Sequence, residues 1–228
     1  MVVLPRVDAR RACVCERRTV AETSVLVPRA LRLQAVGPVL VVLLGSCALG
    51  MLTFPAQGFL PEALASFANS ASGWTVLAAS LVLWSRVGTW PAAVLGASSF
   101  VLLVLGYAVA ADLAGAYYDP SFFGLVGVVV GPFVGVAAAW LRDRGYRAAV
   151  GAGLLGGICA GEAVYGLTVV GATTSPVYWT AIGAVGLALV GMVCVRARAV
   201  GPRVVAAVGA AAVAVAFVEA YARAGSIG

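Results

Sequence analysis

The stretch AAVGAGLLGGICAGEAVYGLTVV, residues 148–170, is uncharged except for Glu162. A run of about 18 or more apolar residues is the signature of a membrane-spanning helix. At about 1.5 Å per residue, these 23 residues are long enough to cross a hydrocarbon core of about 30 Å. The stretch therefore predicts a transmembrane helix, and it raises the question of why a carboxylate lies inside it.

The same apolar signal recurs along the whole chain. Its 228 residues are 62% hydrophobic and 11% charged, which is too apolar for a soluble domain of this size. We predict an all-α, polytopic transmembrane helix bundle with seven spans, which lie at 33–53, 67–85, 89–111, 121–141, 148–170, 177–195 and 204–221. Six spans is the alternative, with either region 54–85 re-entrant or the last segment outside the bundle.

The charged residues predict how the chain is oriented in the membrane. All fifteen basic residues are arginine. With the N-terminus inside, fourteen of them fall in cytoplasmic segments and only Arg223 lies outside, whereas the outer loops carry Glu62, Asp112 and Asp119. This pattern fits the positive-inside rule and accounts for the +6 charge without a nucleic-acid partner. We therefore predict an arginine-rich, disordered cytoplasmic tail over residues 1–32 and one transmembrane domain over residues 33–228.

The residue types argue against catalysis. The sequence contains no histidine and no lysine, which excludes an imidazole base, a lysine Schiff base and a Walker phosphate loop. Cys47, Cys159 and Cys194 lie in apolar runs, where cysteine is a small packing residue. Cys13 and Cys15 alone provide too few ligands for a metal site. We expect no enzyme activity, no cofactor and no metal.

Glycines recur at intervals of four residues in two of the predicted spans. They are Gly127, Gly131 and Gly135 in one span, and Gly153, Gly157 and Gly161 in the next. Such glycines lie on one helix face and let two backbones approach closely. We expect the two faces to meet each other or to close on an adjacent helix.

Glu162 is the leading candidate for a functional residue. An ionised, unpaired carboxylate is costly deep in the membrane, so it must face the bundle interior, meet water or stay protonated. Glu162 and Glu219 lie about 21 and 22 Å from the cytoplasmic side, counted at 1.5 Å per residue. Polar and aromatic residues expected near this level are Gln57, Asn69, Trp74, Tyr107 and Tyr165.

Two interpretations of these residues remain open. In one, they line an outward-facing pocket that binds a small polar or cationic solute or passes protons. In the other, Glu162 is a neutral structural group that Gln could replace at little cost, and Glu219 pairs with Arg223.

The segment LTFPAQGFLPEALASFANSASGW, residues 52–74, is predicted to be a loop or broken helix that caps the outer side. Followed by GPFVGVAAAWLRDR (131–144) and GGICAGEAVYG (156–166), it resembles an actinobacterial family of multi-span membrane proteins known as a domain of unknown function. The resemblance implies an integral plasma-membrane protein and supplies no substrate or catalytic residue. A more distant likeness is to the substrate-binding membrane subunits of vitamin importers, which usually have six spans and use outer loops to cap a ligand.

The expected partner of the chain is the lipid bilayer of the bacterial plasma membrane. The first functional hypothesis is the binding or transport of a solute through the Glu162 pocket. The second is a non-catalytic scaffold that binds a membrane-protein partner, or a second copy of itself, through the glycine-rich helix faces.

Overall fold

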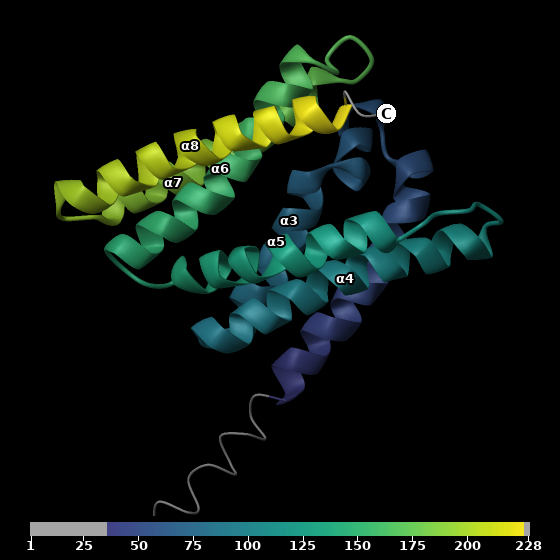
Figure 1. Cartoon of the computed structure of the whole chain (residues 1–228), viewed down its shortest axis with the longest axis horizontal. Helices are drawn as coiled ribbons and strands as arrows, with labels where there is room; N and C mark the ends of the chain where they lie inside the picture. The colour runs from purple at the N-terminus through teal and green to yellow at the C-terminus, as the bar shows by residue number, and fades with distance from the viewer. Residues whose placement is uncertain (1–35, 226–228) are drawn as a thin grey trace, which may run out of the picture. The chain divides into compact units, whose positions relative to one another are not determined.

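The computed structural model describes residues 36–225, and within this range the backbone forms helices joined by short turns (Figure 1). The predicted tail, residues 1–32, lies outside the described residues. Residues 41–228 form one compact unit, and the packing reported below concerns the described part of that unit.

Eight α-helices and one 3₁₀-helix follow one another in the described residues. They are an N-terminal helix (Val36–Phe59), α2 (Glu62–Ala65), the 3₁₀-helix η1 (Ser66–Asn69), α3 (Ala71–Ser85), α4 (Thr89–Leu113), α5 (Ser121–Trp140), α6 (Tyr146–Thr168), α7 (Pro176–Arg196) and α8 (Val200–Gly225). The N-terminal helix and α4 to α8 are the six that are long and apolar enough to cross a membrane. The predicted all-helical membrane bundle is therefore confirmed, with six candidate spans and a shorter apolar helix, α3.

The predicted continuous span 67–85 is the clearest difference from the sequence-based expectation. Ser70 adopts an extended conformation, with φ −124° and ψ 146°, and separates η1 from the 15-residue α3. Its hydroxyl accepts a hydrogen bond from the Gly73 N–H at 2.9 Å, so Ser70 is an N-cap rather than a helix-interior residue. The break falls within segment 52–74, which was predicted to be a loop or broken helix, and the polar residues Asn69, Ser70 and Ser72 mark its position.

The two glycine stripes each close on an adjacent helix and do not face each other. On α5, a Cβ atom at Gly131 would lie 2.6 Å from the Cα of Ala97 on α4. On α6, a Cβ atom at Gly157 would lie 2.6 Å from the Cβ of Val213 on α8. Both faces are therefore occupied by helix packing within the chain.

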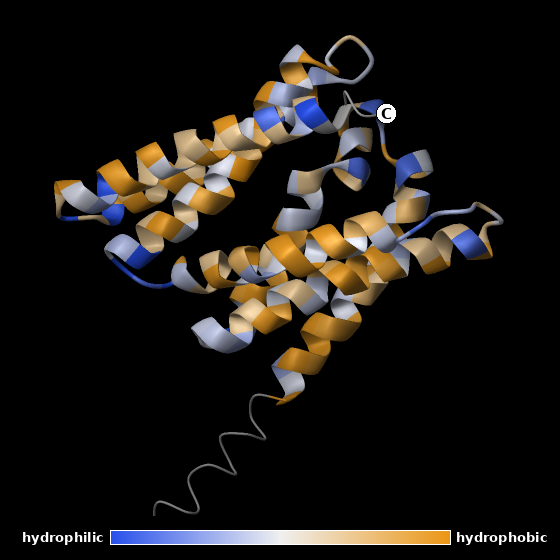
Figure 2. Ribbon diagram, in the orientation of Figure 1, coloured by the Kyte–Doolittle hydropathy of each residue, from blue (hydrophilic) through white to orange (hydrophobic). Residues whose placement is uncertain are grey.

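The connections α3–α4, α5–α6 and α7–α8 lie at the same end of the helices. Arg142 donates a hydrogen bond to the carbonyl of Val87 at 2.5 Å, which joins the first two connections. A Cβ atom at Gly201 would meet the Tyr146 hydroxyl, which places the start of α8 beside the start of α6. Figure 2 shows hydrophilic residues at the α5–α6 and α7–α8 turns between largely hydrophobic helices. The arginines in or beside these connections are Arg86, Arg142, Arg144, Arg147, Arg196, Arg198 and Arg203.

Gly131 and Gly124 provide a matched pair on α5 that tests the close packing. Gly131→Ala should reduce the free energy of unfolding by about 1–3 kcal/mol, because the added methyl group overlaps the α4 backbone. Gly124→Ala should be neutral or stabilising, because no atom lies within 4 Å of the added group. Thermal unfolding of the purified variants in detergent measures both. Equal melting temperatures for the two variants would contradict the α4–α5 contact.

Candidate functional site

Glu162 binds the N-terminus of α3 with its carboxylate. Oε1 accepts a hydrogen bond from the Ala71 N–H at 2.7 Å, and Oε2 accepts one from the Ser72 N–H at 2.7 Å. The Ser72 hydroxyl also donates to Oε2. Only 3% of Glu162 is exposed to solvent, so the carboxylate is enclosed by its partners.

The helix terminus explains why this carboxylate is needed. The first four N–H groups of a helix have no partner within it, and together they give that end a partial positive charge. At the start of α3, Ser72 and Gly73 are buried and Ala71 is half-buried, so water has little access to these groups. Ser70 satisfies the Gly73 N–H, and Glu162 satisfies the two N–H groups before it. A negative charge placed at this end is stabilised by the helix dipole.

A hydroxyl network extends the site to α7. The Tyr178 hydroxyl lies 2.5 Å from the Ser70 hydroxyl and 3.0 Å from the Ser72 hydroxyl. Tyr178 is 4% exposed, and the rings of Phe67 and Trp179 pack against it at centroid distances of 6.2 and 4.9 Å. Within residues 36–225, no buried side-chain nitrogen or oxygen is left without a hydrogen-bond partner. The site therefore joins α3, α6 and α7 through a fully satisfied polar network.

Three of the predicted pocket residues gather in a second cluster. The Gln57 amide donates to the Tyr107 hydroxyl at 3.2 Å, and the Trp74 ring lies 5.8 Å from the Tyr107 ring. Phe54 and Tyr118 pack on the same tyrosine at 5.5 and 4.7 Å. This cluster connects the N-terminal helix, the first turn of α3 and the C-terminal half of α4.

The other predicted pocket residues lie elsewhere. The Tyr165 ring contacts Tyr221 on α8 at 5.4 Å, and Asn69 is exposed at the end of η1. Glu219 pairs with Arg223 at 3.6 Å, and 62% of its side chain is exposed, which agrees with the structural interpretation of this residue. The predicted residues thus do not line a single pocket.

Tyr178 was not among the sequence-based candidates. Its partners are more than 100 residues away in the chain, and a tyrosine near the start of a span is equally typical of a membrane interface. The backbone donors of Ala71 and Ser72 could not be predicted from residue types either. One signal was present: Ser70, directly before an apolar run, is a common N-cap pattern.

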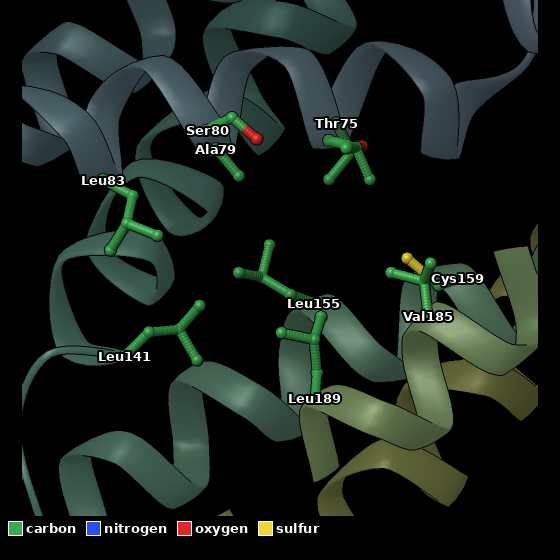
Figure 3. A pocket seen from close by; sticks show the side chains of 10 residues that line it. Thr75, Ala79, Ser80, Leu83, Leu141, Leu155, Cys159, Val185 and Leu189 are labelled. Carbon is green, nitrogen blue, oxygen red and sulfur yellow. The ribbon is translucent and has the colours of Figure 1, made fainter. Parts of the chain in front are cut away.

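A separate apolar groove of about 160 Å³ lies between α3, α6 and α7 (Figure 3). It is lined by Thr75, Val76, Ala79, Ser80, Leu83, Leu141, Leu155, Cys159, Val185 and Leu189. Glu162 is not part of this lining, although Cys159 precedes it by one helical turn. Within the described residues, no cluster of acidic and cysteine side chains could hold a metal ion.

Comparison with known proteins assigns the chain to a family. Residues 29–226 match the sequence model described as "Family of unknown function (DUF6518)", and the chain belongs to this family. No curated protein and no solved structure matches the chain. The distant likeness to vitamin-importer subunits stays a prediction.

The geometry changes what is expected of Glu162→Gln. The sequence suggested that Gln could replace a structural carboxyl at little cost, but all three partners of Glu162 are donors. A Gln side chain would direct its NH₂ group at the Ala71 or the Ser72 N–H, so one of these backbone donors would lose its acceptor. We expect the free energy of unfolding to fall by about 1–3 kcal/mol.

The matched control is Glu219→Gln, which removes an exposed carboxylate on α8. Its effect should stay within about 0.5 kcal/mol, because exposed ion pairs contribute little. Thermal unfolding in detergent compares the two variants. If both unfold at the wild-type temperature, the carboxylate does not cap α3.

Proposed function

We propose that the chain is a multi-pass protein of the bacterial cell membrane that binds or transports a small polar or cationic solute at Glu162. The supporting observation is a buried carboxylate at the break in an apolar segment, bound to the N-terminus of α3. Ionisable residues inside membrane proteins commonly mark solute or proton pathways, and transporters commonly build their sites at discontinuous helices. The arrangement described above corresponds to a closed form, in which protein donors occupy the carboxylate.

The chemistry of the carboxylate favours a cation among small solutes. A carboxylate offers about four acceptor positions, and three donors occupy Glu162 in the closed form. The positive end of α3 and a solute cation would compete for the same negative charge. Binding of the cation would therefore weaken the cap on α3.

The segment that covers the site is the part of the chain we expect to move. Residues 60–69 contain α2 and η1, two elements of only four residues each, and α2 packs on α7. Phe67 of η1 contacts Tyr178 of the polar network. Loss of the cap on α3 would loosen this segment first, because it directly precedes Ser70.

We infer further that η1 and α3 together complete a seventh crossing, with the N-terminus in the cytoplasm. Fifteen residues of α3 span about 22 Å, and η1 extends the segment in the same apolar region. The grouping of arginine-bearing connections at one end supports a cytoplasmic location for that end.

The competing proposal, a scaffold assembled through glycine-rich faces, is less favoured by the packing. Gly131 and Gly135 contact α4, and Gly157 and Gly161 contact α8. A partner helix would have to displace α4 or α8 to use these faces.

A thermal-shift screen of primary amines, quaternary amines, vitamins and divalent cations tests the solute proposal. At about 100 times its dissociation constant, a ligand stabilises the folded state by about 2.7 kcal/mol. For a domain of 150–250 residues, this corresponds to a rise of roughly 5–10 °C in melting temperature.

The response of each variant is measured against its own melting temperature without ligand. Glu162→Gln should lose the ligand response, whereas Glu219→Gln should keep it. If no compound stabilises the wild type, or if Glu162→Gln responds as the wild type does, the carboxylate is purely structural and the proposal fails.

Cysteine labelling of intact cells tests the orientation. In a background without the five native cysteines, an impermeant maleimide should label Asp119→Cys and should not label Arg144→Cys. Asp119 and Arg144 are both exposed, so the difference reports the side of the membrane. Equal labelling of both positions, or labelling of Arg144→Cys alone, would contradict the proposed orientation.

A further inference from the structure

The apolar groove runs along α3 from the polar site toward the arginine-bearing end. Its α3 residues follow in order from Thr75 to Leu83, a length of about 12 Å. Leu155 and Cys159 of α6 and Val185 and Leu189 of α7 form the opposite wall, as Figure 3 shows. The polar side-chain groups in the lining are two hydroxyls and one thiol. An ion that entered the groove would therefore lose its hydration shell without gaining enough polar contacts in return.

A guanidinium group lies at the end of this groove. Arg142 donates hydrogen bonds to the carbonyls of Leu83 at 3.3 Å and Val87 at 2.5 Å, and Leu83 is itself part of the groove lining. A guanidinium has five N–H donors, so these two contacts leave donors for another ligand. Arg142 is exposed, and the same connection carries Arg144.

We propose that this groove binds one acyl chain of an anionic glycerophospholipid, whose phosphate contacts Arg142. The groove lies between the shorter apolar helix α3 and two candidate membrane spans, α6 and α7, where acyl chains replace water as solvent. Its volume is similar to that of an engineered apolar cavity of about 150 Å³ that binds benzene, so it accommodates a segment of a chain. Arginine matches the geometry of a phosphate group through paired N–H donors.

The site is independent of the proposed solute site. Glu162 does not line the groove, and Arg142 lies at the opposite end of α3 from the carboxylate. Failure of the lipid proposal therefore leaves the solute proposal in place, and the reverse also holds.

Native mass spectrometry of the full-length protein tests the lipid site. The protein is incubated with equal amounts of phosphatidylglycerol and phosphatidylcholine that carry the same acyl chains, and the ratio of bound lipids is measured. The wild type should retain phosphatidylglycerol preferentially. Arg142→Gln should reduce this preference about tenfold, the effect expected for loss of one hydrogen bond between charged groups. Arg144→Gln, which removes the same charge two residues away, should have a smaller effect.

Two tryptophan substitutions test the acyl-chain part of the site. Ala79→Trp fills the groove and should lower retention of both lipids. Val128→Trp adds the same ring to an exposed position on α5 and should leave retention unchanged. If Ala79→Trp does not yield a monodisperse protein, Ser80→Phe replaces it, because Ser80 lines the groove at an exposed position with room for a ring.

Three results would overturn the proposal. The first is a wild-type protein without preference for phosphatidylglycerol. The second is an equal loss of preference in Arg142→Gln and Arg144→Gln, which would indicate attraction by the whole basic surface. The third is wild-type retention of both lipids by the groove-filling variant.

Discussion

The structure depends on one constraint: a helix that begins inside an apolar bundle must find acceptors for its first N–H groups. In α3 these acceptors are the hydroxyl of Ser70 and the carboxylate of Glu162. A buried N–H without an acceptor costs about 1–3 kcal/mol, so the buried acid on α6 stabilises the break before α3. The N-terminus of α3 therefore explains why a carboxylate lies in the apolar helix α6: without Glu162, two N–H groups of α3 would lack an acceptor.

The glycines of α6 determine how well Glu162 is held. Gly156 approaches the backbone of Gly186 on α7, and Gly157 and Gly161 approach α8, so small residues let α6 contact a neighbour on each side. Over an apolar stretch of 18 residues in each helix, 72% of α6 is buried and 6% of α8 is buried. A side chain on so enclosed a helix has little freedom to reorient. The position of Glu162 against α3 is therefore a consequence of close backbone packing as well as of hydrogen bonding.

The sequence predicted the helices better than it predicted the site. Long apolar runs separated by arginine-rich turns specify membrane helices, because length and hydropathy are local properties. The polar residues of segment 52–74 indicated a broken helix there, but they did not specify the residue at which it breaks, and the predicted span 67–85 ran through the N-cap at Ser70. The partners of Glu162 are backbone N–H groups about 90 residues away in the chain and hydroxyls fixed by Tyr178, which only the tertiary fold brings together. Glu219 was predicted at a depth similar to that of Glu162, but its side chain is exposed, because depth along a helix does not determine which face a residue occupies.

A charged side chain binds each end of α3. The negative charge is at the N-terminus and the positive charge at the C-terminus, as the helix dipole favours. The carboxylate of Glu162 binds its N-terminus, and the guanidinium of Arg142 binds the Leu83 carbonyl in its last turn and the Val87 carbonyl just beyond. Both groups also have the chemistry to bind an external ligand, a cation in the first case and a phosphate in the second. A cation at Glu162 would compete with the N-terminus of α3, whereas a phosphate would use the N–H donors of Arg142 that the two carbonyls leave available. The four-residue elements α2 and η1 lead directly into α3, so the cap formed by Ser70 and Glu162 also fixes where they join it.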